Sequence, residues 1–374
     1  MFGEDHKRHR RIMNPAFGMS EIKSLVPVFF EAVSTLTNKW KDILLDAKDQ
    51  SEVFNITKWA SRATLDAFGH AGFDYDFGAM EDKDNRLAAA AEMFASPTDG
   101  MLAGGTLLSS IMPSRLMIWA LERMSHSNPR LARGRIMRET ATEVAGKVLA
   151  EKSKELESGN GGRFKDLMSL LSGHNVLVDF CSTVKANTAP QNENNRMSDE
   201  ELMAQLLALF IAGHETTANS LSWTLLELCR NPKIQTKLRQ EIHQKEREIA
   251  AQGRLERGFT AEDLESLTYL DAVVKESLRF QPVVSRMHKT ALTNDVLPLS
   301  QPVRTTSGVE INEIPIAKGQ KAFFSIGTYQ RNKALFGEDA DIFRPERWLE
   351  NSHIINKTTS AGVYANLWVP PSPR

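Results

Sequence analysis

The sequence predicts a mainly α-helical fold with a small β region toward its C-terminal end. A long apolar helical run spans residues 198–230, and a shorter amphipathic helix spans residues 266–280. Between residues 283 and 325 the pattern changes to short stretches of alternating apolar and polar residues, which is typical of strands. The chain has 41% apolar and 25% charged residues, which is the composition of an ordinary globular protein.

The long helix begins and ends with recognisable signals. Ser198 is followed three residues later by Glu201, which is a capping box, and Asn231-Pro232 suits the cap and the first position of the next helix. A polar connection at residues 157–197 precedes this helix, and a helical turn is expected near Gln330. Helical periodicity predicts helices at residues 3–17, 20–48, 54–70, 85–156 (with breaks at Pro97, Gly104-Gly105 and Pro113), 198–230, 232–252 and 266–280.

The centre of the long helix carries the six residues AGHETT, Ala212–Thr217. Gly213, Thr216, Thr217 and Ser220 recur at the spacing of one helix face. A glycine inside a helix costs about 1 kcal/mol relative to alanine, so a purely structural helix would not favour it here. This face could receive a large flat group, or it could let another helix approach closely.

Charged residues recur in two later segments. Glu276 and Arg279 are three residues apart in KESLR, so they share a helix face and can pair. A third charged residue that could join this pair, Arg347, lies in FRPERW at Phe343–Trp348. A buried network and an exposed Glu–Arg pair, worth under about 1 kcal/mol, are the two interpretations of this pattern.

The order AGxxTT, ExxR and PERW resembles the cytochrome P450 family. The resemblance continues in GEDHKRHRRIMNPAF at the start of the chain, which is similar to helix C of fungal microsomal members, and in AGFDYDFGAM, RMSDEELMAQ and FGEDADIFRPERWLE. It implies a single, partial cytochrome P450 domain over residues 1–374, although length alone suggests about two domains. The implied fold is mainly α, with a long central helix.

The resemblance implies a haem-thiolate monooxygenase that activates oxygen and hydroxylates an apolar organic substrate. Gly213, Glu215 and Thr216 would be the catalytic residues, with Glu215 as the acid and Thr216 as the alcohol that relay protons. Thr216 would also bond back to a helix carbonyl. A zinc-protease role for His214 is not favoured, because position 218, where the second histidine would stand, is alanine.

The resemblance also assigns residues to the cofactor, haem (heme). His6 and Arg10 on helix C, and Lys289 with Arg286 nearby, would contact its propionates, although lysine cannot form the bidentate fork of arginine. Glu276, Arg279 and Arg347 would form a structural ion network behind the haem. Breaking such a network leaves an uncompensated buried charge, which costs roughly 3–5 kcal/mol.

NADPH-cytochrome P450 reductase and an apolar small molecule are the implied partners. The net charge of −1 gives no bulk attraction to nucleic acid or membrane. The basic run His6–Arg11 could be a nucleic-acid or targeting patch, but on helix C it would face haem propionates and a redox partner. The family resides at the endoplasmic reticulum membrane. The sequence has no run of about 18 or more uninterrupted apolar residues, so no transmembrane span and no membrane anchor are expected, and the chain would be cytoplasmic.

The chain departs from the family pattern at both ends. The pattern would continue beyond Ala361–Leu367 into a loop that holds the ligand cysteine, but the chain continues as WVPPSPR. The two cysteines, Cys181 and Cys229, lack that context, and Cys229 is expected to be a small buried residue. We therefore expect no metal ligand in this chain, doubtful haem binding, no thiolate spectrum and an inactive chain. A non-catalytic remnant of the family, or a helical ligand-binding or scaffold protein, is the alternative.

An internal departure occurs at Ser172–Thr183. These residues interrupt an otherwise family-like stretch and carry Cys181. We expect an insert that packs poorly, and a natural loop extension is the alternative. The insert and the two ends together suggest a faulty gene model or an unusual splice product.

Overall fold

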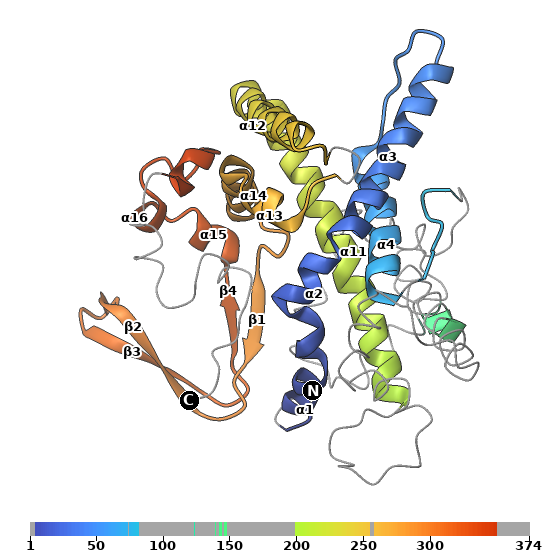
Figure 1. Cartoon of the computed structure of the whole chain (residues 1–374). Helices are drawn as coiled ribbons and strands as arrows, with labels where there is room; N and C mark the ends of the chain where they lie inside the picture. Colours follow the sequence, from blue (N-terminus) through green and yellow to red (C-terminus); the bar gives the residue numbers. More distant parts are fainter. Residues whose placement is uncertain are drawn as a thin grey trace. The chain divides into compact units, whose positions relative to one another are not determined.

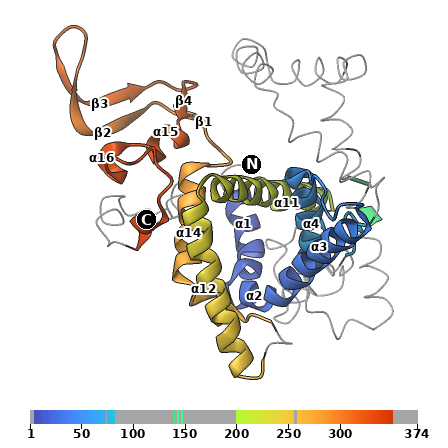
Figure 2. The same ribbon diagram turned by 90° about the horizontal axis from the view of Figure 1, so that it is seen from above.

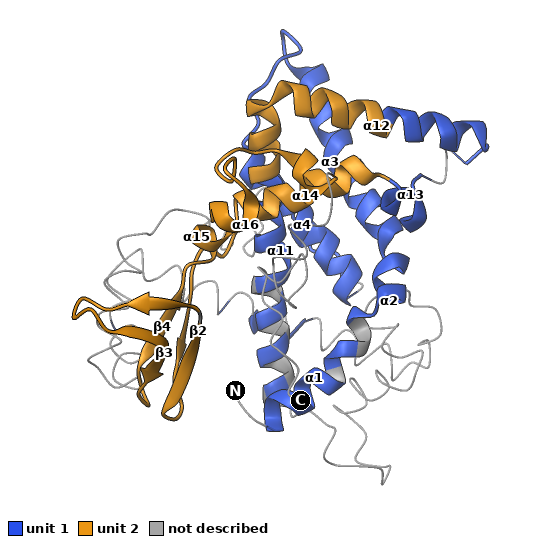
Figure 3. Cartoon of the chain, turned by 90° about the vertical axis from the view of Figure 1, so that its left-hand side faces the viewer, with its two compact units in different colours: residues 1–222, 243–266 blue, residues 223–242, 267–374 orange. Residues whose placement is uncertain are grey.

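The computed structural model describes residues 4–73, 75–81, 199–254 and 258–349, together with positions 123, 139, 142, 143, 146 and 147. Its residues form two compact units, which are residues 1–222 with 243–266 and residues 223–242 with 267–374 (Figure 3). The described chain is mainly helical with a small β region near its C-terminal end, so the predicted fold class is confirmed (Figure 1). The interrupting segment at Ser172–Thr183 lies outside the described residues.

Within the described residues the observed elements follow the predicted order. The helical stretch expected at residues 85–156 lies outside them apart from six positions. The expected helix at residues 3–17 ends in a 3-10 helix, and the expected helix at 20–48 divides in two. In chain order the helical elements are α1 (Glu4–Met13), η1 (Asn14–Phe17), α2 (Met19–Ser24), α3 (Val26–Asp46), α4 (Ile56–Phe73), α11 (Asp199–Arg230), α12 (Pro232–Ala251), α13 (Ala261–Glu265), α14 (Thr268–Phe280), α15 (Ile326–Gln330), α16 (Lys333–Phe336) and η4 (Pro345–Trp348). The strands are β1 (Met287–Thr290), β2 (Asp295–Arg304), β3 (Glu310–Ile316) and β4 (Lys321–Phe324).

In the first unit, eleven residues of α4 are buried. Alanine, serine and threonine occupy many of its buried positions, so neighbouring helices can approach its backbone closely. The helix α3 packs along it (Figures 1 and 2). Trp40 of α3 meets Trp59 of α4 edge to face at 6.4 Å and Phe54 at 5.2 Å, which are favourable geometries for aromatic pairs.

A buried carboxylate fixes the turn that follows α4. Asp66 is 5% exposed and accepts hydrogen bonds from the backbone N–H groups of Ala79 (2.7 Å) and Met80 (2.9 Å). Burial raises the pKa of Asp66, while these two N–H donors act in the opposite direction. One side chain thus satisfies two buried donors that a turn cannot pair within itself.

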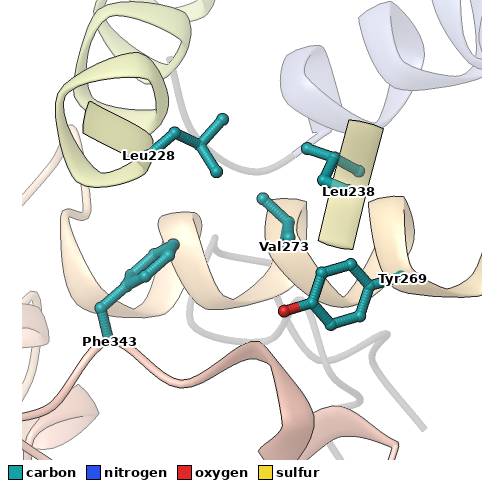
Figure 4. Packing of buried hydrophobic residues seen from close by; sticks show 5 residues of the cluster. All are labelled: Leu228, Leu238, Tyr269, Val273 and Phe343. Atoms are coloured by element: carbon teal, nitrogen blue, oxygen red, sulfur yellow. The ribbon is translucent and has the colours of Figure 1, made fainter. Parts of the chain in front are cut away.

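An apolar cluster holds the second unit together. Its buried members are Leu228 of α11, Leu238 of α12, Tyr269 and Val273 of α14, and Phe343 (Figure 4). Residues 223–242 therefore belong to this unit because their apolar side chains pack on α14.

The β region consists of two antiparallel pairs in the second unit. β1 pairs with β4, with Met287 opposite Phe324. β2 pairs with β3, with Asp295 opposite Ile316, and the register shifts between Pro298 and Val303. The turn between β2 and β3 places Gly308 at a φ of +85°, which glycine adopts without strain. The strands predicted between residues 283 and 325 are therefore confirmed.

We expect Asp66→Ala to lower the free energy of unfolding by about 2 kcal/mol or more, because two buried N–H groups lose their acceptor. Asp76→Ala is the matched control, since the exposed Asp76 also accepts a backbone N–H, from Gly78 at 2.8 Å, and water can replace it there. Urea unfolding followed by circular dichroism measures both. Equal losses in the two variants would contradict the interpretation.

Candidate functional site

The centre of α11 is helical through AGHETT, and its hydroxyl groups bond back to the helix. Thr216 Oγ1 donates to the carbonyl of Ala212 at 2.7 Å, and Thr217 Oγ1 donates to that of Gly213 at 3.0 Å. Both threonine side chains are exposed. Such hydroxyl-to-carbonyl bonds compete with the backbone hydrogen bonds of the helix and weaken it locally. This segment therefore has a polar face of small residues and a less stable helix backbone.

Gly213 packs against α4. A Cβ atom added at Gly213 would lie 2.4 Å from Phe68 Cε2, a distance that real contacts do not allow. The close-approach explanation that the sequence left open therefore applies to Gly213, whereas Thr216 and Thr217 lie on the open face. Thr64 of α4 adds a polar contact, because its Oγ1 donates to the carbonyl of His214 at 3.0 Å.

Glu215 lies toward α4, where several polar groups surround its carboxylate. Ser61 Oγ donates to Oε2 at 3.4 Å, and Asn219 Nδ2 lies 3.3 Å from Oε1. The imidazole Nε2 of the fully buried His214 is 3.7 Å from Oε2, within ion-pair distance when the ring is protonated. No sequence signal pointed to Ser61, because 154 residues separate it from Glu215.

The helix α1 carries the two residues expected to contact propionates. Arg10 is exposed, and His6 is partly buried. Between them, Arg8 Nη2 and His9 Nε2 lie close to one carboxylate oxygen of Glu201, the latter at 3.2 Å. The local sequence pattern places Glu201 only in a capping box, so its contact with α1 is a property of the tertiary structure.

The most extensive polar cluster surrounds Glu276 of α14, whose carboxylate is fully buried. Its Oε1 accepts from Arg279 Nη2 (2.8 Å), the backbone N–H of Arg344 (2.8 Å) and Arg347 Nε (3.2 Å). Its Oε2 accepts from Arg279 Nε (2.8 Å) and Trp348 Nε1 (2.9 Å). The structure thus brings Glu276, Arg279 and Arg347 together, and five donors stabilise the ionised carboxylate.

The two buried arginines also organise the chain between α15 and η4. Each guanidinium donates its remaining N–H groups to backbone carbonyls of this segment, as fully buried charges require. The acceptors of Arg279 are Gln330, Ala340 and Ile342, and those of Arg347 are Phe336, Asp339 and Ile342.

Two members of this cluster were not anticipated, Trp348 and Asp339. Trp348 lies within the FRPERW segment, whose aromatic residue could have suggested it. Asp339 carries no such signal, yet its Oδ1 accepts from Arg347 Nη1 at 2.8 Å and its Oδ2 from Arg344. Burial alone would raise the pKa of Asp339, but Arg347 and Arg344 outweigh burial and hold the pKa below its usual value.

A second carboxylate joins η4 to two helices. Glu346 Oε1 accepts from Tyr269 Oη of α14 at 2.9 Å and from Lys237 Nζ of α12 at 2.8 Å. Burial acts to raise the pKa of Glu346, and Lys237 with Tyr269 overcomes this effect and lowers it. Glu346 therefore joins η4 to α12 and α14.

Three remaining predicted positions lie on the second unit. Lys289 is exposed on β1, with Nζ 6.0 Å from the ring centre of Phe324, and Arg286 is exposed just before that strand. Cys229 is exposed, so the expectation of a small buried residue was wrong. It follows Leu228, which takes the inward position on α11 and leaves the next residue facing outward. Cys181 lies outside the described residues.

Comparison with known proteins identifies the family. A family model described as Cytochrome P450 matches residues 1–363. The chain is 33% identical over 356 residues to Cytochrome P450 monooxygenase claQ of Ampulloclitocybe clavipes, covering 93% of this chain and 60% of that protein. It is 32% identical over 366 residues to Cytochrome P450 monooxygenase 205 of Postia placenta, covering 97% of this chain and 63% of that protein. The chain thus spans a little over 60% of the length of these relatives.

We expect Glu276→Gln to destabilise the fold by about 3–5 kcal/mol, because the amide leaves Arg279 and Arg347 without their buried counter-charge. Lys275→Met, one position away, removes a partly exposed pair with Asp271 and should cost under about 1 kcal/mol. Urea unfolding curves provide both values. A loss under 1 kcal/mol for Glu276→Gln would show that the cluster does not depend on its charge.

The lowered pKa of Asp339 predicts an acid-dependent contribution to stability. A carboxyl with a lower pKa in the folded than in the unfolded state stabilises the fold above the unfolded pKa, near 4, and loses this effect as pH falls through the folded pKa. Asp339→Asn should therefore lower the free energy of unfolding by about 1 kcal/mol at pH 7, and this difference should shrink below pH 4. Unfolding curves at pH 3, 5 and 7 measure it. A difference that is constant with pH would contradict the assignment.

Proposed function

Because the chain belongs to the cytochrome P450 family, we propose that it acts as a haem-dependent monooxygenase that hydroxylates an apolar organic molecule. The observation that carries the proposal is the centre of α11, where Thr216 and Thr217 are exposed and their hydroxyls bond back to the helix. A helix that only packed in a core would favour apolar side chains at these positions.

The basic side chains of the chain suit the haem. His6 and Arg10 are four residues apart on α1 and so share one helix face, and Arg286 and Lys289 lie exposed at β1. Cationic side chains of this kind bind the carboxylates at the edge of a haem. The small residues on the open face of α11 leave space for a flat ring. When bound, the haem supplies dioxygen reduction and oxygen transfer, chemistry that no side chain provides.

In this proposal the chain's own residues supply and hold protons. Glu215 is the proton-donating acid and Thr216 the hydroxyl that passes the proton on, because a hydroxyl both donates and accepts hydrogen bonds. The network of Glu276, Arg279 and Arg347 contributes rigidity, since it holds the segment between α15 and η4 through backbone carbonyls.

The electrons would come from a partner such as NADPH-cytochrome P450 reductase, and an apolar small molecule would be the substrate. Among the helices that the structure describes, none combines the length and apolar character that a membrane span requires.

We expect Thr216→Ala, in protein loaded with haem and supplied with reductase, NADPH and an apolar substrate, to reduce product formed per NADPH consumed by roughly 10-fold or more, with peroxide in its place. Thr217→Ala is the matched control, because Thr217 is an exposed neighbour with the same kind of back bond. Equal effects of the two changes would contradict the assignment of Thr216. A haem-loaded wild type that forms no product would contradict the proposed activity and favour a non-catalytic family member.

A further inference from the structure

The interface between α4 and α11 contains a polar cluster around Glu215 that helix packing alone does not require. Ser61 is 3% exposed and His214 is fully buried, and the Glu215 side chain is 17% exposed. A carboxylate at such a depth is costly unless polar groups around it replace water. The chain supplies these groups from both helices.

The packing of the two helices is provided by other residues. Phe68 fills the space over Gly213, and Thr64 donates to the carbonyl of His214 at 3.0 Å. Ser61 differs from Thr64, because its hydroxyl donates to a carboxylate oxygen rather than to a backbone carbonyl of the facing helix. Its contact is therefore directed at the ionisable group of Glu215.

The neighbouring side chains act differently on the ionised and the protonated state of Glu215. The amide of Asn219 can only donate at Oε1, so it favours the ionised carboxylate. The Ser61 hydroxyl donates to Oε2 at 3.4 Å, so it also favours the ionised carboxylate. The His214 imidazole, 3.7 Å from Oε2, adds a group that favours the ionised form when it is protonated.

We propose that Ser61 is a positioning residue for Glu215, whose ionised carboxylate it holds at the α4 side of α11. The proposal rests on the proposed function, in which Glu215 is the proton-donating acid. Ser61 and Asn219 contact different oxygens of the carboxylate, at 3.4 and 3.3 Å, so together they orient the group. Ser61 acts on the reaction only through Glu215.

The first test is the pKa of Glu215, measured by ¹³C NMR of protein labelled at the glutamate carboxyl carbon, with Glu215→Gln to assign the signal. This measurement requires no activity. Ser61→Ala should raise the pKa of Glu215 by roughly half a pH unit or more, because the ionised form loses a donor. Ser222→Ala is the matched control, since it removes a hydroxyl of α11 that donates to the carbonyl of Ala218 at 2.8 Å, and it should leave the pKa unchanged. An equal pKa in Ser61→Ala and wild type would overturn the proposal.

The second test is a double-mutant comparison in the haem-loaded protein. Ser61→Ala should shift the pH profile of product formed per NADPH consumed in the same direction as the pKa, and it should have no further effect in a Glu215→Gln background. An unchanged pH profile, or an effect of Ser61→Ala that persists in Glu215→Gln, would overturn the positioning role. If Glu215→Gln itself changes nothing while the NMR shift is present, the acid role of Glu215 fails and the contact stands.

Discussion

The burial of the Glu276 carboxylate is the constraint on which the second unit depends. A fully buried charge is stable only when its hydrogen-bonding capacity is filled, and here two arginines, one backbone N–H and one indole N–H fill it. Those arginines are themselves buried, so each needs further acceptors, and the backbone carbonyls between α15 and η4 provide them. The path of that segment therefore follows from the need to satisfy every donor and acceptor around one carboxylate.

The first unit is governed by a different constraint, which is the close approach of α4 and α11. Gly213 allows Phe68 to lie against the α11 backbone, and Thr64 bonds to a carbonyl of that helix. This packing uses one face of α11 and leaves Thr216 and Thr217 exposed on another. The same six residues thus present a packed side and an exposed polar side, and the proposed function uses the second, because successive side chains of a helix point about 100° apart. Packing and chemistry can share one short sequence for this reason.

Glu276 and Glu215 differ in the groups that contact their carboxylates, and the difference suits their proposed tasks. Glu276 accepts five hydrogen bonds between 2.8 and 3.2 Å from two guanidinium groups, a backbone N–H and an indole N–H, so its carboxylate is held in one position. Glu215 has longer contacts with a hydroxyl and an amide and lies near an imidazole that can itself titrate. In the proposed function, Glu276 only has to hold the segment between α15 and η4, whereas Glu215 has to release and regain a proton.

The sequence by itself determined the fold class, the long helix with its polar centre, the strands after residue 283, and the possibility that Glu276, Arg279 and Arg347 associate. These features are local, because periodicity, caps and the i,i+3 spacing depend on residues within a few positions of one another. Only the tertiary structure decided which groups complete each cluster. Ser61 reaches Glu215 across 154 residues and Trp348 reaches Glu276 across 72, and no local pattern encodes such a meeting. It also decided that Gly213 serves packing and that Cys229 faces outward, because burial depends on which neighbour covers each face of a helix, and that neighbour comes from a distant part of the chain.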